Sequence, residues 1–268
     1  MPHAAWAARD ALLDADPARK AAVAQSIWAD WQAGRLDLAG AWCPAPPAKP
    51  GRPTQPELVA PNALARRKLG SVEGRAALIH AITHIEFNAI NLALDAVCRF
   101  PGMPVDYYAD WLRVAAEEAL HFSLLAAHLA TLGYAYGDFP AHDGLWEMAE
   151  KTAADPLARM AMVPRLLEAR GLDVTPAMQA RLIAAGDPAA AAILDIVFRD
   201  EVGHVAVGNR WFRWLCIVRG VSPQETFRQY LHQFDAPRHI GELNVAARLR
   251  AGFEPEELDI LRAFATAQ

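Results

Sequence analysis

Glu118-Ala-Leu-His121 and Glu201-Val-Gly-His204 are the two stretches from which the fold and chemistry of this chain can be worked out. Each stretch places a carboxylate and an imidazole three residues apart, and residues at this spacing share one face of a helix, so each pair can bind one metal ion. A further glutamate precedes each stretch: Glu86 lies 32 residues before the first, and Glu168 lies 33 residues before the second. The repeat predicts a di-metal site with six protein ligands.

The donor types indicate which metals and which compartment to expect. Carboxylates with imidazole suit iron and manganese, whereas the three cysteines are far apart and form no C-x-x-C pair, so neither a zinc knuckle nor a disulfide framework is predicted. The N-terminus has no signal-peptide pattern, and no stretch reaches the ~20 apolar residues of a membrane span. We expect a soluble, cytoplasmic protein without a membrane partner.

Composition and hydrophobic period predict an all-α chain. With 53% apolar residues in a chain of 268, a sizeable core is expected, and alanine and leucine dominate while alternating β-branched runs are scarce. Three segments are predicted: an N-terminal helix and Pro-rich wrapping segment (1–70), a four-helix bundle with the di-metal site (71–220), and a C-terminal helical extension (221–268).

Local signals place the individual helices. A first helix over about 5–32 is interrupted at Asp16-Pro17, and the seven prolines between 44 and 61 predict irregular chain that wraps the bundle. The predicted bundle helices run over about 71–100, 105–133, 144–170 and 187–218, the third with a cap at 155 and a kink at 164, and two short helices then run to about 234 and 264.

Helix lengths test whether the ligands can meet. Glu86 lies about 17 residues before the turn at 102–104 and Glu118 about 15 after it, so the two return to nearly the same level. Glu168 differs in this respect, because it lies only three residues before Gly171, whereas Glu201 lies 14 residues into its own predicted helix. For Glu168 and Glu201 to lie at the same height along the bundle, residues 172–185 must prolong the third helix or fold back. Glu147 and Glu150 are alternatives to Glu168 as the ligand.

The ligand pattern resembles that of the ferritin-like superfamily of di-iron carboxylate proteins, in which two Glu and two Glu-x-x-His converge in a four-helix bundle. Glu117-Glu118 and Asp200-Glu201 also resemble the doubled acids of acyl-carrier desaturases and bacterial multicomponent monooxygenases. The resemblance implies that Glu117 and Asp200 accept hydrogen bonds from the ligand imidazoles; the alternative is that they are solvated surface carboxylates. The metal ligands it implies are Glu86, Glu118, His121, Glu168, Glu201 and His204.

A narrower resemblance extends over most of the chain after about Pro50. The stretches 84–86, 167–173 and 200–204 resemble those of DUF455, a family of ferritin-like proteins. This resemblance favours Glu168 over Glu147 and Glu150. The MiaE-like tRNA hydroxylases are a related branch of the superfamily.

The resemblance implies an oxidoreductase that uses Fe/Fe, or alternatively Mn/Fe, to activate O₂ and to oxidise or hydroxylate a small organic substrate, with electrons from a donor protein. The alternatives are a ferritin-like iron-handling protein without an organic substrate and a metal-stabilised structural bundle. A net charge of −5 argues against a nucleic-acid partner, although tRNA stays open as a substrate. The oligomeric state, a homodimer included, is left open.

Other histidines receive structural interpretations. His84 is about 200° around the helix from Glu86 and should face away from the ligands, so His80 and His84 are expected in the core or on the surface. His128 is expected to serve packing, with a substrate path as the alternative.

Overall fold

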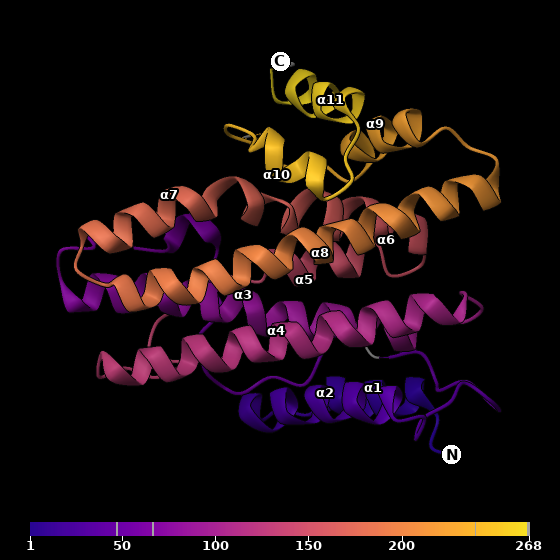
Figure 1. Cartoon of the computed structure of the whole chain (residues 1–268), viewed down its shortest axis with the longest axis horizontal. Coiled ribbons are helices and arrows are strands. Elements are labelled where there is room, and N and C mark those ends of the chain that lie inside the picture. The colour runs from indigo at the N-terminus through magenta and orange to yellow at the C-terminus, as the bar shows by residue number, and fades with distance from the viewer. Residues whose placement is uncertain (47, 66, 239, 267–268) are drawn as a thin grey trace. The chain divides into compact units, whose positions relative to one another are not determined.

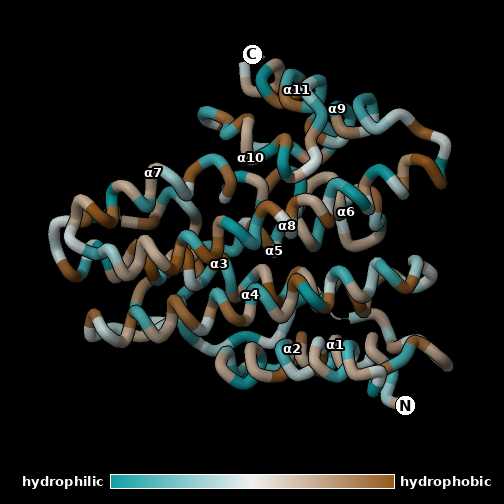
Figure 2. The backbone as a smooth tube through the Cα atoms, viewed as in Figure 1, coloured by the Kyte–Doolittle hydropathy of each residue, from teal (hydrophilic) through white to brown (hydrophobic). Residues whose placement is uncertain are grey.

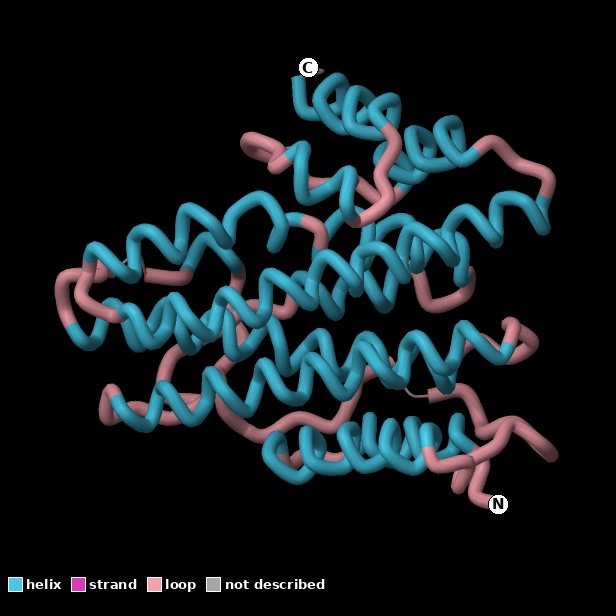
Figure 3. Tube along the Cα trace, viewed as in Figure 1, coloured by secondary structure: helices cyan, strands magenta, loops and turns pink. Residues whose placement is uncertain are grey.

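The computed structural model describes residues 1–46, 48–65, 67–238 and 240–266, and these are helical apart from loops and two isolated β-bridges (Figure 3). The predicted all-helical class is confirmed. The helices are α1 (Ala4–Leu13), α2 (Pro17–Gln32), α3 (Val72–Arg99), α4 (Val105–Thr131), α5 (Gly144–Lys151), α6 (Pro156–Met162), α7 (Arg170–Ala184), α8 (Pro188–Arg219), α9 (Pro223–Gln233), α10 (Val245–Arg250) and α11 (Pro255–Thr266), with a 3₁₀ turn η1 (Pro61–Ala63) and a π-helical turn η2 (Val163–Glu168).

The chain forms two compact units. Unit one comprises 1–146 and 181–193, and unit two comprises 147–180 and 194–268. These units follow contacts in space, whereas the predicted segments 1–70, 71–220 and 221–268 follow the sequence, and those segments stay predictions. Helices α5, α7 and α8 each contribute residues to both units.

Capping residues begin and end the helices close to where the sequence predicts. Asp16 accepts a hydrogen bond from the backbone N–H of Arg19 and Pro17 opens α2, which confirms the predicted interruption of the first helix. Ser71 accepts from the N–H of Gly74 at the start of α3, and Gly133, with φ of +82°, follows the end of α4. The helix α10 was not predicted, because its six residues carry too short a hydrophobic pattern.

Unit one is built around the antiparallel hairpin of α3 and α4 (Figure 1). Helix α2 packs on α4, and α1 packs on α3 and α2. Apolar and polar residues interleave along these helices, as Figure 2 shows, and the face of α3 that carries Ile79, Ile90 and Leu94 is fully buried. Among the described residues α3 is the one helix long and apolar enough to cross a membrane, but 78% of its most apolar window is buried, as in the core helix of a soluble protein.

The Pro-rich segment crosses unit one as irregular chain, as predicted; Pro47 lies outside the described residues. Its backbone polar groups bind distant parts of the unit: the carbonyl of Ala48 accepts from the indole of Trp146 (2.8 Å), and Val59 donates to the carbonyl of Ala141 (2.8 Å). The described part of this segment is therefore held by contacts with distant residues, which no local sequence pattern predicts.

Unit two is organised around a buried arginine. Arg165, on the π-helical turn, is paired with Glu257 of α11, and its guanidinium lies 4.0 Å from the ring centroid of Phe212 and 4.4 Å from that of Phe227. A second buried pair, Arg248 with Asp173 (2.7 Å), joins α10 to α7. These contacts hold the C-terminal helices in the unit.

Candidate metal centre

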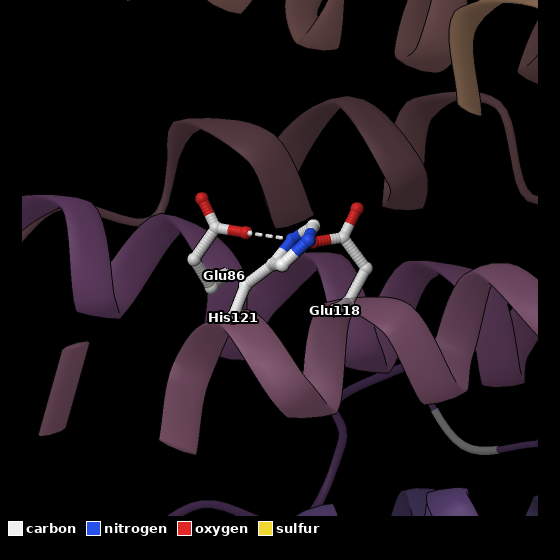
Figure 4. A group of neighbouring side chains, drawn as sticks. All are labelled: Glu86, Glu118 and His121. Carbon is white, nitrogen blue, oxygen red and sulfur yellow. Dashed lines mark hydrogen bonds and ion pairs between the residues drawn. The ribbon is translucent and has the colours of Figure 1, made fainter. Parts of the chain in front are cut away.

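Three of the six predicted ligands form a buried cluster in unit one. Glu86 comes from α3, and Glu118 and His121 come from successive turns of α4, with the imidazole between the two carboxylates (Figure 4). Nδ1 of His121 lies 3.2 Å from Oε2 of Glu86 and 3.3 Å from Oε2 of Glu118. All three side chains are at most 3% exposed, and one ligand atom of each lies within 4.8 Å of the others. The predicted return of Glu86 and Glu118 to one level is thus observed.

The electrostatics of this cluster favour a positive charge. Burial and the neighbouring carboxylate of Glu118 raise the pKa of Glu86 well above its ordinary value. Burial alone would lower the pKa of His121, but hydrogen bonds with Glu118 and Glu86 raise it to about 11. Without a metal, a proton on His121 therefore offsets part of the negative charge; a metal ion bound through Nδ1 would have to displace that proton.

Three aromatic rings pack together on, or after, the helices that carry the cluster. Phe87 and Phe122 directly follow Glu86 and His121, and their ring centroids lie 5.8 Å apart. The ring of Tyr136 stands 5.6 Å from that of Phe87 and 5.3 Å from that of Phe122. No spacing in the sequence distinguishes Tyr136, because it lies in the loop after α4, outside the helical spacing that identifies the ligands.

The other three predicted ligands belong to unit two. His204 is fully buried, and its Nδ1 lies 3.8 Å from Oε1 of Glu201 one turn earlier on α8. Glu168 is partly buried and ends the π-helical turn η2. In η2 the N–H of Ala169 donates to the carbonyl of Pro164 (3.1 Å), a five-residue spacing that accommodates the proline where a kink was predicted.

Two glycines define the register of α8 against η2 and α7. A Cβ added to Gly208 would lie 2.5 Å from Cβ of Pro164, and one added to Gly171 would lie 4.0 Å from Cγ of Glu201. The two segments are therefore antiparallel: position 164 lies opposite 208, and position 171, seven residues later, lies opposite 201, seven residues earlier. The same register brings Glu168 level with His204.

Of the two possibilities for residues 172–185, prolonging the third helix or folding back, the structure shows the first. Helix α7 begins at Arg170, passes through Gly171 and runs to Ala184, so it prolongs the helical direction before the chain turns at Gly186 (φ +81°). The alternatives Glu147 and Glu150 lie earlier, on or at the end of α5.

The acids beside the motifs have arginine partners. Glu117 pairs with Arg113 (3.1 Å) and Asp200 pairs with Arg199 (2.9 Å). These pairs neither require nor exclude a hydrogen bond to a ligand imidazole, so the predicted acceptor role stays a prediction.

Three further histidines, His80, His84 and His128, make contacts within unit one. Nδ1 of His84 lies 2.9 Å from the hydroxyl of Tyr136, and Nε2 of His80 accepts from the N–H of Gly137 (2.9 Å). Both histidines are buried, so of the two predicted locations, core or surface, the structure shows the core. Nε2 of His128 lies 3.0 Å from Oδ2 of Asp187, which also caps the start of α8 through Ala190. His128 therefore ties α4 to that cap, in agreement with the favoured packing role.

Comparison with known proteins places the chain in a family. The model of "Protein of unknown function (DUF455)" matches residues 13–259. The chain belongs to the DUF455 family. This DUF455 protein is also 51% identical over 214 residues to an uncharacterized protein of Haemophilus influenzae, a match that covers 77% of this chain and 74% of the relative. No solved structure matches the chain.

Proposed function

We propose that the chain is a ferritin-like di-metal carboxylate oxidoreductase that uses Fe/Fe, or Mn/Fe, to activate O₂ and to oxidise or hydroxylate a small organic substrate. The buried cluster of Glu86, Glu118 and His121 carries this proposal. Burial of two carboxylates beside one imidazole is costly unless cations offset their charge. The donor set of carboxylates and imidazole fits iron and manganese.

The second set supports a centre of two ions. Glu168, Glu201 and His204 repeat the donor types of the first set, and the register of α8 brings Glu168 level with His204. We infer that each set supplies three ligands, so that six side chains hold two ions, with Glu168 rather than Glu147 or Glu150 as the sixth.

Bound in reduced form, two such ions supply electrons for the reduction of dioxygen. The side chains of unit one have two tasks in that chemistry. Glu86 and Glu118 offset the charge of the cations, and His121 contributes a neutral nitrogen once its proton has left. An electron-donor protein completes the proposal, and the buried free thiols of Cys43, Cys98 and Cys216 fit a reducing cytoplasm.

Metal stoichiometry is the first test. Protein purified from cells supplemented with iron and manganese is expected to hold two ions per chain, and an anaerobic ferrous titration followed by an O₂ pulse should change the absorbance. Glu118→Ala and His204→Ala should each lose at least one ion, whereas the control His84→Ala should keep both. Full metal retention in both ligand variants would overturn the site.

The same titration separates the proposed oxidase from iron handling. In an enzyme with an organic substrate, oxidation of ferrous ions should stop after about two ions per chain, because six ligands hold two ions. Continued oxidation of many ferrous ions per chain, in a large assembly by native mass, would favour the iron-handling alternative. Two ions without any response to O₂ would favour the structural bundle.

A further inference from the structure

Unit one contains a pocket of about 520 Å³ that lies on a different face of α3 from the ligand Glu86. Its floor is one stripe of α3, on which small residues leave room, and its walls come from residues 64–65, 67–69 and 139–145. The volume falls within the range typical of small-molecule sites. The lining residues are Leu64, Ala65, Arg67, Leu69, Gly74, Ala77, Leu78, Ala81, His84, Ile85, Asn88, Phe139, Pro140, Ala141, His142, Leu145 and Arg181.

The charge of the lining contrasts with that of the chain. The chain has a net charge of −5, yet the described residues that line the pocket include two arginines and no acid. The guanidinium of Arg67 lies 5.1 Å from the ring centroid of Phe139 and is held from outside the pocket by Glu73 (3.1 Å). Arg181 supplies the second positive charge. The walls are otherwise largely apolar.

A buried polar group lies at the base of the pocket. Asn88 is 1% exposed, and its Nδ2 donates to the carbonyl of His84 (3.1 Å), while its Oδ1 is buried without a hydrogen-bond partner. An unsatisfied acceptor in such a place indicates that a donor is missing.

We propose that this pocket binds an amphiphilic organic anion, whose apolar body lies along α3 between Ala81 and Phe139, whose anionic group meets Arg181 and Arg67, and whose N–H or O–H donor reaches Asn88. The apolar walls supply most of the affinity, and the arginines select for the anion. The site is separate from the ligand cluster, and binding requires no metal.

The test uses the full, metal-free chain and 8-anilinonaphthalene-1-sulfonate, which combines an apolar body, one N–H donor and one sulfonate. Its uncharged analogue N-phenyl-1-naphthylamine has the same body without the sulfonate. Fluorescence titrations of both probes are compared for the wild type, Arg181→Ala, Ala81→Phe and the control Arg35→Ala, which removes an exposed arginine elsewhere in unit one. Circular dichroism checks that each variant is folded.

The wild type should bind the sulfonate at one saturable site and more tightly than the uncharged analogue. Arg181→Ala should weaken the sulfonate about tenfold, as expected for one charge-assisted contact, and leave the analogue unchanged. Ala81→Phe fills the floor of the pocket and should weaken both probes, whereas Arg35→Ala should weaken neither. Equal affinity of the two probes for the wild type, or unchanged sulfonate affinity in both pocket variants, would overturn the proposal. Because no metal is present, neither result bears on the metal centre.

Discussion

Nδ1 of His121 on α4 lies 3.2 Å from Oε2 of Glu86 on α3, so the contact joins the two central helices of unit one through the predicted metal ligands. If a divalent ion replaces the proton of His121, it should stabilise the folded chain, because the unfolded chain cannot assemble the cluster. Anaerobic Fe²⁺ or Mn²⁺ at 100 times its dissociation constant should raise the free energy of unfolding by about 2.7 kcal/mol. Thermal unfolding with and without the ion, and after chelation, measures the effect.

The isosteric variant Glu118→Gln should show little of this gain, since it removes one charged ligand from the cluster but retains its volume. His84→Ala, two residues before Glu86 on α3 but bonded to Tyr136, should keep the gain. Equal stabilisation of the wild type and Glu118→Gln would show that the ion binds elsewhere.

Gly208 allows α8 to approach the π-helical turn. Because a Cβ at this position would lie 2.5 Å from Cβ of Pro164, Gly208→Ala should force the two segments apart and destabilise the chain by about 1–3 kcal/mol. Gly171→Ala is the matched control, since its Cβ would meet Cγ of Glu201 at an ordinary 4.0 Å and alanine favours a helix. Urea unfolding of both variants measures the difference, and equal stabilities would contradict the close approach.

How far the sequence can predict this molecule follows from the range of its signals. Helix ends such as Asp16-Pro17, and the close approach of Glu118 and His121 on one face of a helix, are encoded within a few residues, and the structure shows both. The level of Glu168 depends on whether the chain continues helically through Gly171, which tertiary packing decides. Pro164 predicts a kink in the helix. That the kink takes the form of a π-helical turn, packed closely against Gly208, is visible only in the structure.

Partners that lie far apart in the sequence were beyond prediction. Arg165 pairs with Glu257 across 92 residues, and Arg52 pairs with Asp143 across 91. None of these four residues lies in a periodic pattern that distinguishes it from the other charged residues of the chain. The pocket beside Arg181 was missed for the same reason, because its walls come from loops whose positions are fixed by such contacts.

The buried pair of Arg165 and Glu257 should be essential to unit two. Glu257 accepts hydrogen bonds from both Arg165 and Arg213 (2.7 Å for Arg213). Glu257→Ala therefore leaves the guanidinium of Arg165 buried without its carboxylate partner and should lower the free energy of unfolding by about 3–5 kcal/mol. Asp259→Ala is the control on the same helix, because its pair with Arg262 is exposed and should change the stability by less than about 0.5 kcal/mol. Chemical denaturation of the two variants makes the comparison, and a loss below 1 kcal/mol for Glu257→Ala, on the order of an exposed pair, would contradict a buried ion pair.

Lys20 should give the stability of the chain a distinct dependence on pH. Its ammonium is fully buried and donates to the carbonyls of Leu12 (3.1 Å) and Gly51 (2.7 Å) and to Asn91, and burial lowers its pKa to about 7. In the unfolded chain a lysine has a pKa of about 10.4. Between these two values the unfolded chain binds more protons than the folded chain, so the contribution of Lys20 to stability rises with pH from about 7 to about 10 and is flat below that window.

Urea unfolding of the wild type and Lys20→Met between pH 6 and 10 isolates this contribution, because the other titrating groups cancel in the difference. The stability of the wild type relative to Lys20→Met should increase by on the order of 2 kcal/mol between pH 7 and pH 9. A difference that stays constant over this range would mean that the hydrogen bonds to Leu12, Gly51 and Asn91 hold the ammonium charged in the folded chain at its ordinary pKa.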